Sequence, residues 1–176
     1  ATRGVYRVRL SSAGRAAHSS YPELGESAIE KLLDGLVALR EIVLPTDEVL
    51  GDTTYTVGLI EGGIAPNVVP PSAEADINFR IVSPASDVRA CLATLPPSVT
   101  VEDIMVVPPV TLKTIDGFAT EVFRFTTDIP FLDSWGEPLL IGPGSVHVAH
   151  TVDEHVKIPE LTQAVDLYEK LARTLL

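Results

Sequence analysis

The chain has 176 residues, a single cysteine and a formal charge of −11, with 13 Lys and Arg against 24 Asp and Glu. This acidic excess argues against a nucleic-acid or anionic-membrane surface, because both ligands select clustered cations. A lone cysteine excludes a disulfide framework and favours a cytoplasmic location. No apolar run approaches the roughly 20 residues that a membrane-spanning helix needs.

Residues 1–110 alternate between strand and helix patterns. A helix is expected to start at the N-cap Ser27, with Glu30 completing a capping box, and to end before Pro45. A shorter helix is expected between Pro84 and Pro96. Strands are predicted where apolar and polar residues alternate, at residues 5–10, 53–60, 73–81 and 99–107. The order βαββαβ predicts the α+β class, as a ferredoxin-like sandwich of one antiparallel sheet with two helices on one face.

The pattern changes after Pro109. A weak helix is expected at residues 116–126 and a short apolar strand at residues 139–141. Pro159 indicates the first turn of a last helix, whose apolar residues are expected to form a broad buried stripe. A single strand has no partner for its backbone groups. We therefore expect residues 1–110 to form a self-sufficient domain and residues 111–176 to be an incomplete piece of an α/β domain.

Four histidines are the first candidates for chemistry. His147, His150 and His155 follow a Gly-Pro-Gly turn, where imidazoles are either zinc ligands or ordinary surface side chains. His18 lies in a loop of small residues between a strand and a helix. It either donates a hydrogen bond to a substrate oxyanion or is simply solvated.

Asn67 and Arg80 are the next candidates. Asn67 follows two glycines, so its amide either binds a carbonyl or carboxylate, or stabilises a turn. Arg80 lies on the polar face of a predicted strand. It either clamps a carboxylate or pairs with Glu74 or Asp76.

Three ordered motifs resemble one known family. They are Gly14-x-Ala-Ala-His-Ser-Ser-x-Pro22, then Gly62-Gly-x-x-x-Asn-Val-Val-Pro70 with a strand ending in Asn78-Phe-Arg80, and a tail with Thr127-Asp-Ile-Pro-Phe-Leu132, Gly142-Pro-Gly-Ser145 and Ala149-His-Thr-x-Asp-Glu154. Together they resemble the co-catalytic zinc aminoacylase/carboxypeptidase family, which includes acetylornithine deacetylase, succinyl-diaminopimelate desuccinylase and carboxypeptidase G. The resemblance covers nearly the whole chain.

The resemblance implies a catalytic α/β domain with an inserted ferredoxin-like lid that mediates homodimerisation. It implies that His18 reaches the partner subunit's active site and polarises the scissile carbonyl. It further implies that Asn67 and Arg80 contact the substrate, that Gly142, Gly144 and Ser145 line its pocket, and that His150 is a zinc ligand. The complete enzymes bind two zinc ions and act on small N-acyl amino acids.

Most of the metal site that the family needs is missing from these residues. The family draws its other metal ligands and general base from a His-x-Asp segment, a separate Asp and a Glu-Glu pair, and this sequence has neither His-x-Asp nor Glu-Glu. We therefore interpret the chain as the lid and C-terminal segment of a deacylase, resembling acetylornithine or acetyl-lysine deacetylases and inactive alone. The chain starts without Met, which fits a piece of a longer protein. The alternative is a non-catalytic ferredoxin-like module for dimerisation or small-ligand binding.

Overall fold

The computed structural model describes residues 1–176, which form two compact units, Ala1–Pro138 and Leu139–Leu176. Residues 111–138 cluster with the first unit, although the sequence groups them with the tail. The end of the ferredoxin-like domain at residue 110 stays a prediction.

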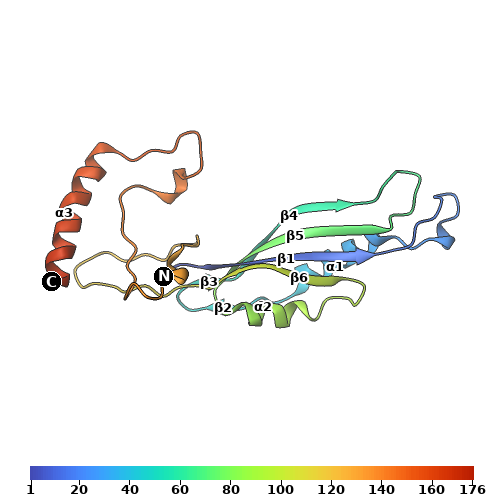
Figure 1. The fold of residues 1–176 in the computed structure, drawn as a ribbon, viewed down its shortest axis with the longest axis horizontal. Coiled ribbons are helices and arrows are strands. Elements are labelled where there is room, and N and C mark those ends of the chain that lie inside the picture. Colours follow the sequence, from blue (N-terminus) through green and yellow to red (C-terminus); the bar gives the residue numbers. More distant parts are fainter. The chain divides into compact units, whose positions relative to one another are not determined.

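The first unit contains the predicted sandwich (Figure 1). Its four-stranded sheet is antiparallel, with the order β4-β5-β1-β6. A two-stranded ribbon, β2–β3, follows the first helix. The bounds are β1 (Gly4–Ala13), α1 (Ala28–Glu41), β2 (Thr46–Asp47), β3 (Gly51–Asp52), β4 (Thr54–Gly62), β5 (Ser72–Ile81), α2 (Ala85–Leu92) and β6 (Thr100–Val107). The ferredoxin-like α+β fold is therefore confirmed.

A single apolar core lies between the sheet and the two helices. Tyr6 and Phe79, from neighbouring strands, are fully buried with ring centroids 6.1 Å apart. Leu32 and Leu39 of α1 and Val88 of α2 belong to the same buried cluster. Burying a large apolar side chain contributes about 1.5–3 kcal/mol, so this shared core holds both helices on one face of the sheet.

Helix α1 begins as the sequence predicts. The Ser27 hydroxyl accepts a hydrogen bond from the Glu30 backbone N–H at 3.2 Å and so caps the first turn. The helix ends at Glu41, before Val43, whose side chain is 88% exposed. The apolar period of the helix therefore stops one turn earlier than the sequence indicates.

Strand β4 departs from its predicted alternation. Tyr55 and Val57 pack against the core, but the register shifts between Val57 and Leu59. This bulge places Leu59 opposite Asp76, on the face away from the helices, where it is 61% exposed. One inserted residue changes the face of every residue that follows it, so the bulge turns Leu59 outward.

Two predicted elements of the tail are wrong. Residues 116–126 form no helix, and residues 139–141 form no strand. The start of the chain satisfies backbone groups in the first of these segments, because Phe123 N–H donates to Ala1 O at 2.9 Å and Arg3 N–H donates to Phe123 O at 3.1 Å. Such bonds offer the backbone an alternative to a helix.

The remaining elements are short, except the last. They are the 3₁₀ turns η1 (Pro22–Leu24), η2 (Ile129–Phe131) and η3 (Val146–Val148), and the helix α3 (Ile158–Leu175). The predicted last helix is confirmed, with Pro159 in its first turn. Its predicted buried stripe is wrong, since only Ala164 is buried and the second unit holds no other long element. None of the helices has the length and apolarity that crossing a membrane requires.

Candidate functional site

The loops that carry His18 and Asn67 lie side by side at one end of the sheet (Figure 1). Val69 N–H donates to Ala17 O at 2.9 Å, and Ser19 N–H donates to Asn67 O at 3.0 Å. His18 and Val68 form the antiparallel bridge between these bonds. The structure therefore brings these two predicted site residues together, although 49 positions separate them.

Backbone contacts close the His18 loop at its base. Arg15 and Glu26 exchange two backbone hydrogen bonds, of 2.8 and 2.9 Å. Lys31 forms an ion pair with Glu26 at 2.7 Å, and this pair lowers the pKa of the Glu26 carboxyl. A Cβ on Gly14 would lie 2.1 Å from the Glu26 carbonyl oxygen, so only glycine fits there. The exposed loop is thus fixed at both ends.

The His18 ring has a defined hydrogen-bonding direction. Its Nδ1 accepts a hydrogen bond from the Ser20 backbone N–H at 3.1 Å. In a neutral imidazole one nitrogen accepts and the other carries the proton, so this bond assigns the proton to Nε2. The exposed ring therefore offers Nε2–H as a donor, as a polariser of a substrate carbonyl must.

Asn67 lies in a turn that its own side chain does not hold. Gly63, at φ +76°, turns the chain away from β4, and Val68 N–H donates to Ala65 O in a turn beside Asn67. The Asn67 side chain itself is exposed, and only its backbone carbonyl makes a hydrogen bond. The turn therefore leaves the side-chain amide available to a ligand.

Arg80 lies far from this pair. It faces Val5 and Thr54 near the end of β5, whereas Ser72, at the start of β5, lies opposite Ala13 beside the loops. At about 3.3 Å per residue, the length of β5 from Ser72 to Arg80 is roughly 26 Å. The structure therefore does not bring Arg80 together with His18 and Asn67 within one copy of the chain.

Of the two alternatives for Arg80, the pairing with an acidic neighbour on the sheet is wrong. Arg9 holds those carboxylates, at 3.4 Å from Glu74 and 2.7 Å from Asp76. The hydrogen bond from Arg9 lowers the pKa of Asp76. Arg80 instead donates from Nη1 to the Thr126 hydroxyl at 3.2 Å. Sequence reasoning missed Thr126, because nothing local relates a residue in an irregular segment to a strand.

The second unit holds the glycine-rich turn and its serine. Gly144 has φ +91°, and the Ser145 hydroxyl accepts a hydrogen bond from His147 N–H at 3.2 Å, which caps η3. A Cβ added to Gly142 would meet no atom within 4 Å, so steric contacts do not require glycine at this position. Gly142, Gly144 and Ser145 thus shape one loop, whose pocket role stays a prediction.

His150 follows that loop in a strained conformation. It is the only non-glycine residue with positive φ, at 62°, and its N–H donates to Glu154 Oε2 at 3.0 Å. A non-glycine residue in this region costs on the order of 1–3 kcal/mol, and such residues cluster at functional sites. The Ala149-His-Thr-x-Asp-Glu154 motif therefore has a structural role in holding this turn.

These histidines do not assemble a metal site within the chain. No three His, Cys, Asp or Glu side chains lie close enough to hold an ion together. His155 Nδ1 instead contacts the Asp153 carbonyl at 2.6 Å. Zinc takes about four ligands, so the residues of this chain do not fit a complete zinc site by themselves.

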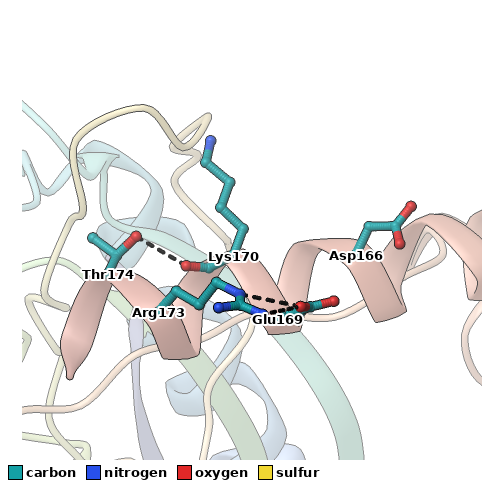
Figure 2. A pocket seen from close by; sticks show the side chains of 5 residues that line it. All are labelled: Asp166, Glu169, Lys170, Arg173 and Thr174. Carbon is teal, nitrogen blue, oxygen red and sulfur yellow. Dashed lines mark hydrogen bonds and ion pairs between the residues drawn. The ribbon is translucent and has the colours of Figure 1, made fainter.

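Figure 2 shows a depression along one face of α3, lined by charged and polar side chains. Glu169 and Arg173 form an ion pair across it at 2.7 Å, and the Thr174 hydroxyl donates to the Lys170 carbonyl. Pairs at this spacing stabilise the helix that carries them. None of the predicted site residues lines the depression.

The class of protein follows from the sheet, from its paired loops and from a family model that matches the sequence. Residues 1–96 match the family model described as the peptidase dimerisation domain of the M20 peptidases, so the chain belongs to this family. The family resemblance noted from the motifs is confirmed.

The relatives are peptidases by name. A probable carboxypeptidase of Paracoccidioides lutzii is 35% identical over 197 residues, covering 96% of this chain and 44% of that protein. One from Ajellomyces dermatitidis is 37% identical over 195 residues, covering 96% and 45%. The chain thus spans less than half the length of these relatives. Among solved structures, an aminopeptidase PepT from Bacillus cereus shares the fold with a TM-score of 0.67, at 20% identity over 95% of this chain and 50% of that one.

Proposed function

We propose that this chain is the lid and C-terminal segment of a zinc-dependent amidohydrolase that cleaves an amide bond next to a free α-carboxylate. N-acyl amino acids and the C-terminal residue of a peptide share this chemistry. Cleavage of such a bond is compatible both with the deacylase activity that the motifs indicate and with the carboxypeptidase names of the relatives. Among N-acyl amino acids, the tail motif favours acetylornithine or acetyl-lysine. A cytoplasmic location fits the single thiol.

The observation that carries the proposal is the orientation of the His18 ring. Attack on an amide carbonyl develops negative charge on its oxygen, and a fixed N–H donor stabilises that charge. His18 offers such a donor from a loop fixed at both ends. Asn67, on the adjacent loop, is the second polar contact to the substrate, and Arg80 is the contact to its carboxylate.

The separation of His18 from Arg80 requires two copies of the chain. An N-acetyl amino acid is about 7 Å long, far shorter than the roughly 26 Å along β5 that keeps the two side chains apart. One copy cannot place both on one substrate. We therefore infer that each site takes His18 from one subunit and Arg80 from its partner.

An apolar strip beside the free edge of β4 supports a homodimer of this kind. Ile29, Leu33 and Val37 share one face of α1, and Ile29 packs near Gly62 at the end of β4. Leu33, Val37 and Ile60 are 45%, 58% and 58% exposed. An unpaired edge strand flanked by apolar side chains favours pairing with a second copy across a two-fold axis.

The chain supplies a small part of the metal site in this proposal. His150 is its one zinc ligand, and Gly142, Gly144 and Ser145 line the substrate pocket. The remaining zinc ligands and the general base come from the part of the relatives' length that this chain does not span. Zinc supplies a Lewis acid at the carbonyl when bound.

Mixing two inactive variants of the complete protein tests the shared site. H18A and R80A homodimers are each expected to lose most activity against an N-acyl amino acid. After unfolding and refolding together, random assembly makes half of the dimers heterodimers, each with one intact site. Activity should therefore return to about a quarter of wild type. Absence of recovery, with heterodimers demonstrated by mass, would contradict the shared site.

The alternative is a non-catalytic dimerisation or ligand-binding module, which the gene can distinguish. An open reading frame upstream of Ala1 that encodes His-x-Asp and Glu-Glu supports the hydrolase. An in-frame stop codon immediately before Ala1 supports the module.

A further inference from the structure

Arg80 is held by a residue that no motif includes. Its Nη1 donates to the Thr126 hydroxyl at 3.2 Å, and that hydroxyl donates to the Arg3 carbonyl at 3.0 Å. The Thr126 hydroxyl thus donates its single proton to the Arg3 carbonyl and accepts the Arg80 N–H on a lone pair. Because its donor is committed to the start of β1, its acceptor direction is fixed, and with it the position of the guanidinium.

Three arginines gather at this end of the sheet, and none of them has a carboxylate at ion-pair distance. Arg80, Arg3 and Arg124 take part in no ion pair, in a chain that carries a net charge of −11. Arg3 is 7% exposed and donates to the Leu50 carbonyl. Burial and the nearby Arg124 charge lower the pKa of Arg3, although Asp52 opposes them. A buried cation with no carboxylate at ion-pair distance is costly even with Asp52 nearby, so this end of the sheet suits an anionic ligand.

Uncommitted polar groups occur at the same end. The buried hydroxyls of Thr53, Ser83 and Thr127 have no hydrogen-bond partner. Thr53 precedes the residue that faces Arg80 across the sheet, Ser83 follows the end of β5, and Thr127 adjoins Thr126. Buried polar groups in folded proteins are nearly always paired, so the region is polar beyond what its own contacts require.

We propose that Thr126 is a positioning residue that orients the Arg80 guanidinium toward the substrate carboxylate. This inference rests on the function proposed above, because it takes Arg80 as the carboxylate contact. Arg80 keeps the rest of its five N–H donors free for a bidentate bond. Thr126 thereby favours substrates with a free carboxylate over their amides.

Nuclear magnetic resonance of the 176-residue chain tests the positioning without any substrate. The order parameter of the Arg80 Nε–Hε group, assigned by its loss in R80K, measures the mobility of the guanidinium. T126V removes the hydroxyl and nearly keeps the shape, and T126S keeps the hydroxyl. We expect Arg80 to become mobile in T126V and to stay ordered in T126S. Equal order in wild type and T126V overturns the inference, whatever the function.

Titration of the same three proteins tests the consequence for binding, with N-acetylglycine and N-acetylglycinamide as matched probes. We expect wild type and T126S to bind the carboxylate probe more tightly, and T126V to bind it two- to tenfold more weakly, since ordering a side chain costs about this much. If T126V binds the carboxylate probe as wild type does and R80K binds it more weakly, the role of Thr126 is contradicted and Arg80 remains the carboxylate contact. Equal binding of both probes by wild type contradicts Arg80 as the carboxylate contact as well. Thermal unfolding of T126V separates both results from a loss of fold.

Discussion

Tyr6 shows how one residue joins the core to the surface. Its ring is fully buried, and its hydroxyl donates to Asp103, which also pairs with Arg89. The Arg89 guanidinium lies 5.7 Å from the centroid of the Tyr6 ring. Burial, together with the bond to Asp103, raises the pKa of Tyr6 to about 12, and the same bond lowers the pKa of Asp103. The network ties β1, α2 and β6 together at the edge of the core.

The raised pKa predicts an alkaline loss of stability that depends on Tyr6. Below the ordinary tyrosine pKa of about 10, the phenol is protonated in both states and its contribution is complete. Between pH 10 and about 12 the unfolded state loses its proton first, so stability falls by up to about 2–3 kcal/mol. Urea unfolding at several pH values measures this.

Y6F should be less stable at neutral pH, by about 1–3 kcal/mol, because the Asp103 carboxylate loses a donor. It should also lack the Tyr6 part of the alkaline fall. Y21F is the matched control, since Tyr21 is 59% exposed, and it should unfold as wild type. If the free energy of unfolding of Y6F falls above pH 10 as steeply as that of wild type, the network does not hold the Tyr6 proton.

At the level of elements, the two free edges of the sheet differ in chemistry. Beside β4 lie Leu33, Val37 and Ile60, which are apolar and exposed. β6 also exposes apolar side chains, with Ile104, Met105 and Val106 39–44% exposed, but it carries the Arg89–Asp103 ion pair, which desolvation in an interface would penalise. The β4 edge is therefore the better candidate for the dimer contact.

A charge on α1 should separate the dimer. V37D introduces a carboxylate into the apolar strip, so we expect a monomer at tens of micromolar, where wild type sediments as a dimer. V43D is the control, because Val43 lies beyond the end of α1 and is already 88% exposed. A monomeric wild type, or the same mass for V37D and V43D, would contradict pairing through this edge.

Periodicity predicted the elements that depend on burial alone. The alternation of β5 and the period of α1 both follow one apolar face, and the structure confirms both elements. Periodicity failed where backbone partners decide the outcome. The bulge before Leu59 and the pairing of Phe123 with the first residues depend on contacts that a local pattern does not contain.

The site was predictable only in part for the same reason. The family resemblance predicted that His18 acts in the partner subunit's site and that Asn67 and Arg80 contact the substrate. The structure places His18 and Asn67 on adjacent loops. The distance from these loops to Arg80 follows from the register of β5, which no motif encodes. The bond from Arg80 to Thr126 joins residues 46 positions apart.

At the scale of the whole molecule, the proposed function makes the chain one part of a catalytic apparatus. In that proposal, one copy supplies two parts of a substrate site from opposite ends of its sheet, and His150 to the metal site. A second copy would bring the proposed substrate contacts together. Further metal ligands and a general base are needed for turnover.

Hydrolysis by the purified 176-residue chain tests this account most directly. We would measure release of the amino acid from an N-acetyl amino acid, and from a peptide with a free C-terminus, with zinc or cobalt added. The predicted result is no turnover above the blank, while the complete reading frame under the same conditions is active. Metal-dependent turnover by the chain alone, abolished by H150A, would contradict the account.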